Sequence, residues 1–199
     1  MILIGLILLS QPIYGFFQTK KLPCGSIHTS LLMGLDHIGC LNHGCDLYHG
    51  KDYAKSSLMK IMVTLYGARK QIDLCMYRFT LSQIAKIFIQ SIPRGVKIRI
   101  ITDKAGPNER IENDQIPRLR HYGIRVREKD NRPGAREDSV RSLMHNKFVI
   151  IDEDHCILGS FNWTYAGVMH HDESVISCHE PRVVRKLVSK FNDLWDKLG

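Results

Sequence analysis

The sequence contains no internal repeat and no low-complexity segment, which excludes solenoids, propellers and disordered arrays. Its 199 residues are enough for one ordinary domain plus a short extra element. Acidic residues are also few, with 20 Asp and Glu against 28 Lys and Arg. Residues 94–147 hold 14 of the basic residues and 8 of the acidic ones. This stretch is the expected anion-facing surface, suited to nucleic acid or anionic lipid, although a merely solvated basic face has the same composition.

The amino terminus lacks two features of a secretory signal peptide. No Lys or Arg precedes the apolar run of residues 1–17, and no clear small-x-small cleavage site follows it. The first basic residues are Lys20 and Lys21, on the carboxyl side of the run. We therefore predict an uncleaved membrane anchor in residues 1–20, with the rest of the chain in the cytosol by the positive-inside rule. A cleaved signal peptide and a buried segment are the alternatives.

A cytosolic domain is kept reduced, so the six cysteines are not expected to form disulfides. Three lie in apolar, strand-like runs and are expected to be inert core residues: Cys75, Cys156 and Cys178. The other three lie in residues 21–50, a polar segment rich in Gly and His. Thiolates and imidazoles suit tetrahedral zinc, and this segment offers four ligands for one structural ion: Cys24, Cys40, Cys45 and His49. His43 or His28 could replace His49, and an unliganded loop is the alternative.

Hydrophobic periodicity divides residues 51–199 into helices and strands. Four helices are predicted, at residues 53–69, 81–92, 114–122 and 181–198. Six strands are predicted, at residues 71–79, 96–102, 123–127, 147–152, 155–159 and 173–178. Only Glu153 and Asp154 separate the fourth strand from the fifth, which indicates a hairpin. The predicted fold class is therefore α/β, a mixed β-sheet flanked by helices.

Polar residues beside the last strands carry the candidate chemistry. Residues two apart on a strand share a face, so His145 and Lys147 project together where an apolar strand begins. An imidazole can attack phosphorus while an ammonium neutralises the nonbridging oxygens. Ser160 and Asn162 repeat the spacing and can donate to the same oxygens, while Glu173 can orient an imidazole and stabilise its charged form. Each residue alone has a common structural role, such as a turn or cap, but together they predict a phosphate site.

The sequence resembles the phospholipase D superfamily in one compound motif: His145-x-Lys147-x4-Asp152, then Gly159-Ser160-x-Asn162, then Glu173. Its single motif copy, its anchor, its Cys/His segment and its Ser-Phe-Asn-Trp-Thr run are similar to the Zucchini, or mitochondrial phospholipase D, group. The resemblance implies a phospholipase D-like sandwich in residues 51–199, an anchor in the outer mitochondrial membrane and a homodimer. It also implies a phosphodiesterase with no catalytic metal, acting as a single-strand endoribonuclease of piRNA biogenesis or as a cardiolipin hydrolase.

The same resemblance implies a mechanism and a role for each motif residue. Superfamily members with two motifs use one histidine as nucleophile and the other as acid, so one motif per chain implies a site shared by two chains. His145 of one copy then attacks phosphorus and forms a phosphohistidine, His145 of the other protonates the leaving oxygen, and water releases a 5′-phosphate product. Glu173 supports the histidine, and Asp152 is expected to be structural, pairing with a basic group. Three residues hold the phosphate: Lys147, Ser160 and Asn162.

Three functions are compatible with the sequence. An RNA nuclease can use the basic stretch as a groove for a single-stranded backbone, through Arg110, Arg118, Arg120 and Arg136. A lipid hydrolase is favoured by the anchor but needs an apolar cleft that the sequence does not reveal. A scaffold that only binds RNA or lipid does not need the motif's histidine and lysine, and both are present. We expect the RNA nuclease, with cardiolipin hydrolysis as the alternative.

Overall fold

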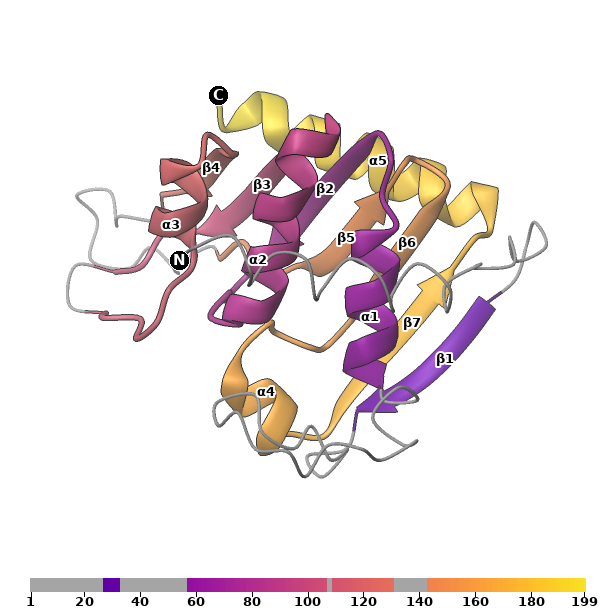
Figure 1. Cartoon of the computed structure of the whole chain (residues 1–199), viewed down its shortest axis with the longest axis horizontal. Helices are drawn as coiled ribbons and strands as arrows, with labels where there is room; N and C mark the ends of the chain where they lie inside the picture. The colour runs from indigo at the N-terminus through magenta and orange to yellow at the C-terminus, as the bar shows by residue number, and fades with distance from the viewer. Residues whose placement is uncertain (1–26, 33–56, 107–108, 131–142) are drawn as a thin grey trace, which may run out of the picture.

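The computed structural model describes residues 27–32, 57–106, 109–130 and 143–199, which build one seven-stranded sheet with helices on both faces (Figure 1). The strand order is β1-β7-β6-β5-β2-β3-β4. β2, β3 and β4 are parallel, and every other neighbouring pair is antiparallel. The strands are β1 (Ile27–Leu32), β2 (Gln71–Met76), β3 (Lys97–Asp103), β4 (Arg125–Lys129), β5 (Lys147–Ile151), β6 (His155–Gly159) and β7 (Glu173–Cys178). The predicted mixed sheet and the β5–β6 hairpin are confirmed.

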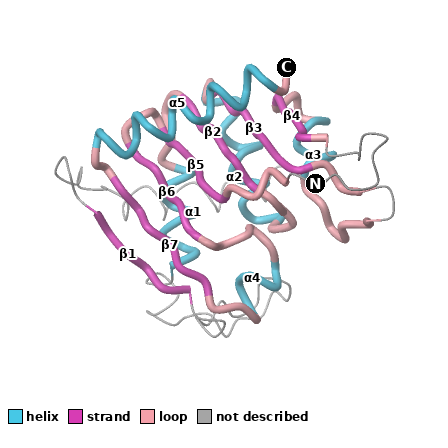
Figure 2. The backbone as a smooth tube through the Cα atoms, turned by 180° about the vertical axis from the view of Figure 1, so that it is seen from behind, coloured by secondary structure: helices cyan, strands magenta, loops and turns pink. Residues whose placement is uncertain are grey.

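The helices cover the sheet in two layers. They are α1 (Ser57–Tyr66), α2 (Ser82–Ser91), the 3-10 turn η2 (Ile92–Arg94), α3 (Ile116–His121), α4 (Tyr165–Met169) and α5 (Pro181–Lys197). The opposite views of Figures 1 and 2 show α1 and α2 on one face of the sheet and α5 lying across the other. The central strands are therefore covered on both faces.

The sequence of β5 shows how the two layers create two hydrophobic cores. Val149 and Ile151 are buried in the cluster that contains the apolar residues of α1 and α2. Phe148 and Ile150, which alternate with them, are buried in the cluster that contains the apolar residues of α5. A strand covered on both faces reads as an unbroken apolar run, because both sets of alternating side chains leave water. This burial fixes the position of the polar residues that precede β5.

Three elements differ from the sequence prediction. β1 lies within the segment assigned to zinc binding and pairs with β7. α4 has five residues, too few for a periodic signal, and begins where the Thr164 hydroxyl accepts a hydrogen bond from the Gly167 amide at 3.0 Å. β2 ends at Met76, so Tyr77 and Arg78 lie just beyond the strand.

Two further predictions concern the cysteines and the anchor. Cys75, Cys156 and Cys178 are free and buried, which confirms them as core residues. Burial raises the pKa of the Cys75 thiol, and raises that of Cys156 to about 12, so both remain protonated at neutral pH. The predicted anchor, residues 1–20, lies outside the described residues. Within the part of the chain that the structure describes, no helix is long and apolar enough to cross a membrane.

Candidate active site

The first residue of β5, Lys147, contacts the histidine that precedes the strand. Lys147 Nζ donates to the carbonyl oxygen of His145 at 2.9 Å and lies 3.3 Å from Nδ1 of its ring. An ammonium can only donate, so Nδ1 accepts in this contact and the ring proton lies on Nε2. The structure thus brings together the two residues that the spacing predicted to project together.

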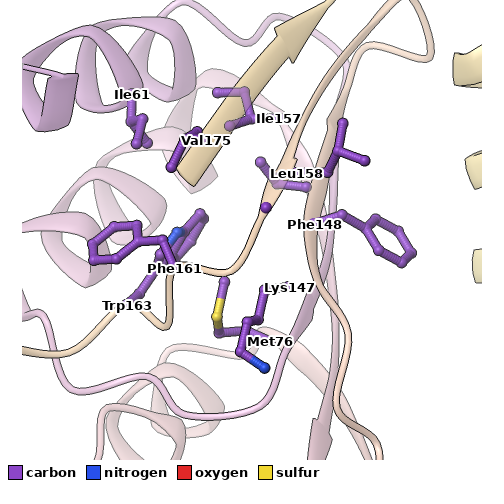
Figure 3. Close-up of a pocket in the computed structure, with 11 residues that line it drawn as sticks. Ile61, Met76, Lys147, Phe148, Ile157, Leu158, Phe161, Trp163 and Val175 are labelled. Atoms are coloured by element: carbon purple, nitrogen blue, oxygen red, sulfur yellow. The ribbon is translucent and has the colours of Figure 1, made fainter. Parts of the chain in front are cut away.

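The surroundings of Lys147 lower its pKa below the ordinary value for lysine. The largest cause is removal of its ammonium from water; the negative charge of Glu173 opposes the shift, and the positive charge of Arg78 adds to it. Figure 3 shows Lys147 beside Met76 at a small apolar pocket. That pocket has a volume of about 10 Å³, close to one water molecule. Lys147 is therefore a partly desolvated cation, which strengthens its attraction for an anion.

Ser160 directly follows β6, and its hydroxyl forms hydrogen bonds with two residues of β7. Its hydroxyl donates to the carboxylate of Glu173 and accepts from the Ser174 amide at 3.0 Å. A hydroxyl has a single proton, so in this arrangement Ser160 has none left to donate to a phosphate. To donate to a phosphate, the Ser160 hydroxyl would have to turn away from Glu173, and its predicted role as a phosphate donor stays a prediction.

Glu173 begins β7 and is buried, unlike most carboxylates. One of its oxygens is bonded to Ser160, and the other lies 3.9 Å from Nδ1 of the exposed His171. Its predicted partner was the His145 ring, whereas its bonded partner in this chain is Ser160. The Glu173 carboxylate also acts on Lys147 through its negative charge, which opposes the lowering of the Lys147 pKa.

Asn162 lies in the turn between β6 and α4. Its side-chain Oδ1 is buried and makes no hydrogen bond with any described residue. Its backbone carbonyl accepts from the Thr164 amide at 2.7 Å, which holds the turn in place. A buried amide oxygen without a donor is costly, and only a donor group can satisfy it. The predicted contact with a phosphate would instead use the NH2 group of Asn162, because phosphate oxygens only accept.

Asp152 lies at the opposite end of β5. Its carboxylate accepts three backbone amides, from Arg69 at 2.9 Å, Lys70 at 2.7 Å and Gln71 at 2.9 Å. These bonds fasten the β5–β6 hairpin to the start of β2. They give Asp152 a structural task, as predicted, but its partners are main-chain amides rather than a basic side chain. They also hold Asp152 in the left-handed region, at φ 53°, which is uncommon for residues other than glycine.

Four residues at the site have no counterpart in the predicted set. The Tyr77 ring lies 4.6 Å from the His145 ring, centroid to centroid, and the Arg78 guanidinium stacks 3.9 Å from the Tyr77 centroid. The buried Asp103 ends β3 and accepts the Met144 amide at 2.8 Å, which fixes the chain just before the motif. His171 is the fourth, through its approach to Glu173. The sequence offered one signal for three of them, since Tyr77, Arg78 and Asp103 stand at the carboxyl ends of parallel strands, where α/β proteins place their sites.

Two of the predicted RNA-contacting arginines, Arg118 and Arg120, lie away from this cluster. Arg118 and Arg120 are exposed on α3, beside the edge strand β4, and β3 and β2 separate β4 from β5 in the sheet (Figure 1). Arg120 pairs with Glu128 at 3.1 Å. Arg110 is exposed in the loop before α3, and Arg136 lies outside the described residues.

The proposed zinc ligands Cys24, Cys40, Cys45 and His49, and the substitute His43, all lie outside the described residues. The backbone of His28 belongs to β1. Within the described ranges, no three His, Cys, Asp or Glu side chains gather as ligands of a metal would. The zinc site therefore stays a prediction from the sequence.

Comparisons with known proteins connect this geometry to a family. Residues 61–195 match a family model described as "Cardiolipin synthase, PLD-like domain". A mitochondrial cardiolipin hydrolase from Chlamydomonas reinhardtii is 29% identical over 181 residues, which cover 91% of this chain and 71% of that protein. The protein of the same name from Homo sapiens is 32% identical over 155 residues, which cover 78% of this chain and 56% of that protein. The chain thus spans little more than half the length of its human relative.

Solved structures share the fold at lower sequence identity. Nuc from Salmonella typhimurium, a phospholipase D family member, superposes with a TM-score of 0.62 at 21% identity, covering 86% of this chain and 95% of that one. NucT from Helicobacter pylori superposes with a TM-score of 0.65 at 20% identity, covering 86% and 97%. The family model covers well over half of this chain, and the motif histidine and lysine meet at one edge of the sheet. The chain therefore belongs to the phospholipase D superfamily of phosphodiesterases, in the group that includes the mitochondrial cardiolipin hydrolases.

Proposed function

We propose that this protein cleaves single-stranded RNA by attack of His145 on phosphorus, in a site completed by a second copy of the chain. The observation that carries the proposal is the contact between His145 and the partly desolvated Lys147. This contact supports the proposal, because an imidazole and an ammonium side by side can both interact with one phosphate. We further propose piRNA biogenesis at the outer mitochondrial membrane as the setting, with residues 1–20 as the anchor and the catalytic domain in the cytosol.

The first step of this mechanism requires a change in the His145–Lys147 contact. Attack through Nε2 needs a lone pair there, so the ring proton must move to Nδ1, which now faces the Lys147 ammonium. A bound phosphate attracts Lys147 to its nonbridging oxygens and so frees Nδ1 to carry the proton. The bond from Nε2 to phosphorus then forms as the bond from phosphorus to the 3′ oxygen breaks. The negative charge of Glu173 stabilises the imidazolium that results.

The second copy supplies the acid, because each chain carries a single motif. Its His145 gives a proton to the leaving 3′ oxygen and afterwards takes one from water. That water attacks phosphorus, the phosphorus–nitrogen bond breaks, and the product leaves with a 5′ phosphate. No 2′-hydroxyl takes part in either step, so no cyclic phosphate forms.

Cardiolipin hydrolysis is the second candidate, because the relatives named above are called mitochondrial cardiolipin hydrolases. The same two steps would release phosphatidic acid. The small size of the apolar pocket beside Lys147 argues against a buried acyl chain at that point. A lipid substrate would have to present its headgroup from the membrane while its chains stay in the bilayer.

The test compares three substrates with the full chain in mild detergent: single-stranded RNA, duplex RNA and cardiolipin vesicles. His145→Ala serves as the control on each substrate. Cleavage of single-stranded RNA to 5′-phosphorylated fragments, identified by mass spectrometry, with intact vesicles, supports the nuclease. Robust vesicle hydrolysis with intact RNA would overturn it in favour of the lipid substrate.

A further inference from the structure

Tyr77 and Arg78 place a second cation beside the catalytic pair. They follow β2 directly, and Met76 at the end of that strand pairs with Lys147 in the register of β2 and β5. The Arg78 guanidinium lies 3.9 Å from the centroid of the Tyr77 ring, and Lys147 Nζ lies 5.3 Å from the same centroid. The His145 ring is 4.6 Å from it. One aromatic ring therefore adjoins the nucleophile and two positive charges.

The Arg78 guanidinium is held in a fixed orientation. Nη1 donates to the carbonyl oxygen of Tyr77 at 3.0 Å, and Nη2 donates to the hydroxyl of the same residue at 3.1 Å. The guanidinium lies 4.0 Å from the buried carboxylate of Asp103. Asp103 also accepts the Met144 amide, so it fixes both Arg78 and the start of the motif. These interactions preorganise the Arg78 guanidinium before any ligand binds.

The remaining partner of Arg78 is exchangeable. Nη2 also donates to Glu109, whose side chain is 37% exposed in the loop before α3, against 0% for Asp103. An exposed ion pair adds little to stability, because water competes for both charges. An arginine fork binds phosphate as readily as carboxylate. A phosphate can therefore replace the exposed Glu109 while the buried partner Asp103 stays in place.

The positive charge of Arg78 also acts on Lys147. It contributes to the lowered pKa of Lys147, which means that the two charges repel one another across this part of the site. One phosphodiester carries a single negative charge and neutralises only one of them. A substrate with a second phosphodiester nearby neutralises both.

We propose that Tyr77 and Arg78 form a second phosphate subsite, which takes the phosphate next to the one that His145 attacks. In a single RNA strand, consecutive phosphodiesters are joined by a three-carbon bridge, through C3′, C4′ and C5′ of one ribose. The substrate class is therefore a strand with two adjacent charged linkages, and the base between them is free to stack on exposed surface. This subsite rests on the function proposed above. It adds to that function a preference for a second phosphodiester beside the scissile one.

The experiment uses short strands in which all linkages but one or two are neutral methylphosphonates. The first strand has one phosphodiester and the second has two consecutive phosphodiesters. We expect the full chain to cleave the second strand with a kcat/KM on the order of tenfold higher, after correction for its two scissile positions. Arg78→Gln should lose that gain, so that the ratio of kcat/KM for the second strand to kcat/KM for the first falls to about one. Arg78→Lys should keep part of the gain.

Arg185→Gln is the matched control, because Arg185 is exposed on α5, across the sheet from α2. Binding of both strands to His145→Ala provides a readout that needs no turnover. In that background, Arg78→Gln should weaken only the two-phosphodiester strand, and Glu109→Gln should strengthen it by removing the competing carboxylate. The thermal midpoint of each variant separates loss of binding from loss of folding.

Several outcomes would overturn the subsite. An equal loss on both strands together with a lowered midpoint would make Arg78 a structural residue. If the original chain cleaved both strands equally well, the protein would not recognise a second phosphate. The proposed nuclease activity would still stand. If Arg78→Gln still cleaved the two-phosphodiester strand tenfold better than the one-phosphodiester strand, the second phosphate would be bound by residues other than Arg78. Cleavage of neither strand, with no binding to His145→Ala, would remove the nuclease and the subsite together. An Arg78 effect on cardiolipin vesicles alone would assign the residue to a lipid headgroup instead.

Discussion

The two ends of β5 contrast in how their polar groups are satisfied. At the far end, the Asp152 carboxylate is saturated by three backbone amides of the same chain. At the near end, Lys147 bonds to its neighbour His145, and the buried Oδ1 of Asn162 has no partner among the described residues. Both ends belong to one motif and are equally prominent in the sequence. A motif residue whose hydrogen bonds are all made within the chain therefore has a structural role, whereas a residue whose polar group is only partly bonded can still contact a substrate.

Removal of the nucleophile should have the largest effect and should leave the far end untouched. We expect His145→Ala to abolish phosphodiester cleavage, with the thermal midpoint and RNA affinity nearly unchanged, because the side chain is exposed and packs on little else. Lys147→Ala should lower kcat by about 10²–10³, because the charged transition state is then less stabilised. Single-turnover cleavage and circular dichroism measure the two properties. Substantial turnover by His145→Ala would contradict the assignment.

Asp152→Asn should reverse that pattern, with a large loss of stability and little loss of chemistry. The amide can accept fewer of the bonds from Arg69, Lys70 and Gln71, and its NH2 group opposes their donors. We expect the free energy of unfolding to fall by about 2–3 kcal/mol. Urea denaturation gives this value, with the exposed Asp172→Asn as control. A fully stable Asp152→Asn that has lost cleavage would show that the far end serves catalysis.

The pH dependence of cleavage should test whether cleavage requires the positive charge of Lys147. The pKa of this residue is lowered, so its charge is lost at a lower pH than an ordinary lysine would lose it. The alkaline limb of kcat/KM should therefore begin below the pH expected for lysine, and Lys147→Arg should move that limb upward, since arginine stays charged. Arg78→Gln should also move it upward, by removing a nearby positive charge. An alkaline limb that is unchanged in Lys147→Arg would assign it to another group.

Zinc removal should affect stability and leave the chemistry intact. Brief treatment with EDTA should not change initial cleavage rates, whereas Cys40→Ser or Cys45→Ser should lower stability or substrate engagement. Zinc content by atomic absorption and the thermal midpoint test this prediction. An immediate loss of turnover that added magnesium restores would contradict the proposed chemistry.

The smallest effects should come from the four arginines that the sequence predicts to contact RNA. Neutralising Arg110, Arg118, Arg120 or Arg136 should weaken single-stranded RNA binding modestly and without sequence preference. Removing one arginine–phosphate interaction should reduce the slope of log affinity against log salt by roughly 0.7. Arg120→Gln should have a small effect, because its charge is already paired with Glu128. Affinity that is independent of salt would exclude this surface as a path for the backbone.

Much of the fold could be predicted from the sequence, because burial on one or both faces leaves a periodic pattern. The strand at 173–178 and the hairpin formed by β5 and β6 follow from such patterns. β1 could not be predicted, because its three polar residues, 28–30, are consecutive and give no alternating pattern, and the segment around them is rich in His and Cys. Its strand character depends on pairing with β7, which is distant in the sequence.

The sequence predicted part of the residue set of the candidate site, but it could not predict the hydrogen bonds among those residues. The motif identified His145 and Lys147 and indicated that they meet. It could not show that the only proton of Ser160 is given to Glu173, because that bond depends on how β6 and β7 are aligned. It also missed Arg78, since a single arginine after a strand has no pattern of its own.

The mixed direction of the sheet has a consequence for folding. The site takes residues from the carboxyl ends of β2, β3 and β6 and from the amino ends of β5 and β7, which meet at one edge only because the sheet is part parallel and part antiparallel. These segments span residues 77–173, and no two neighbouring strands in the chain suffice to build the site. Pairings between distant segments form late and slowly, because a long loop must close before any of them is made. A chain in which these five strands have not yet paired therefore lacks the complete site.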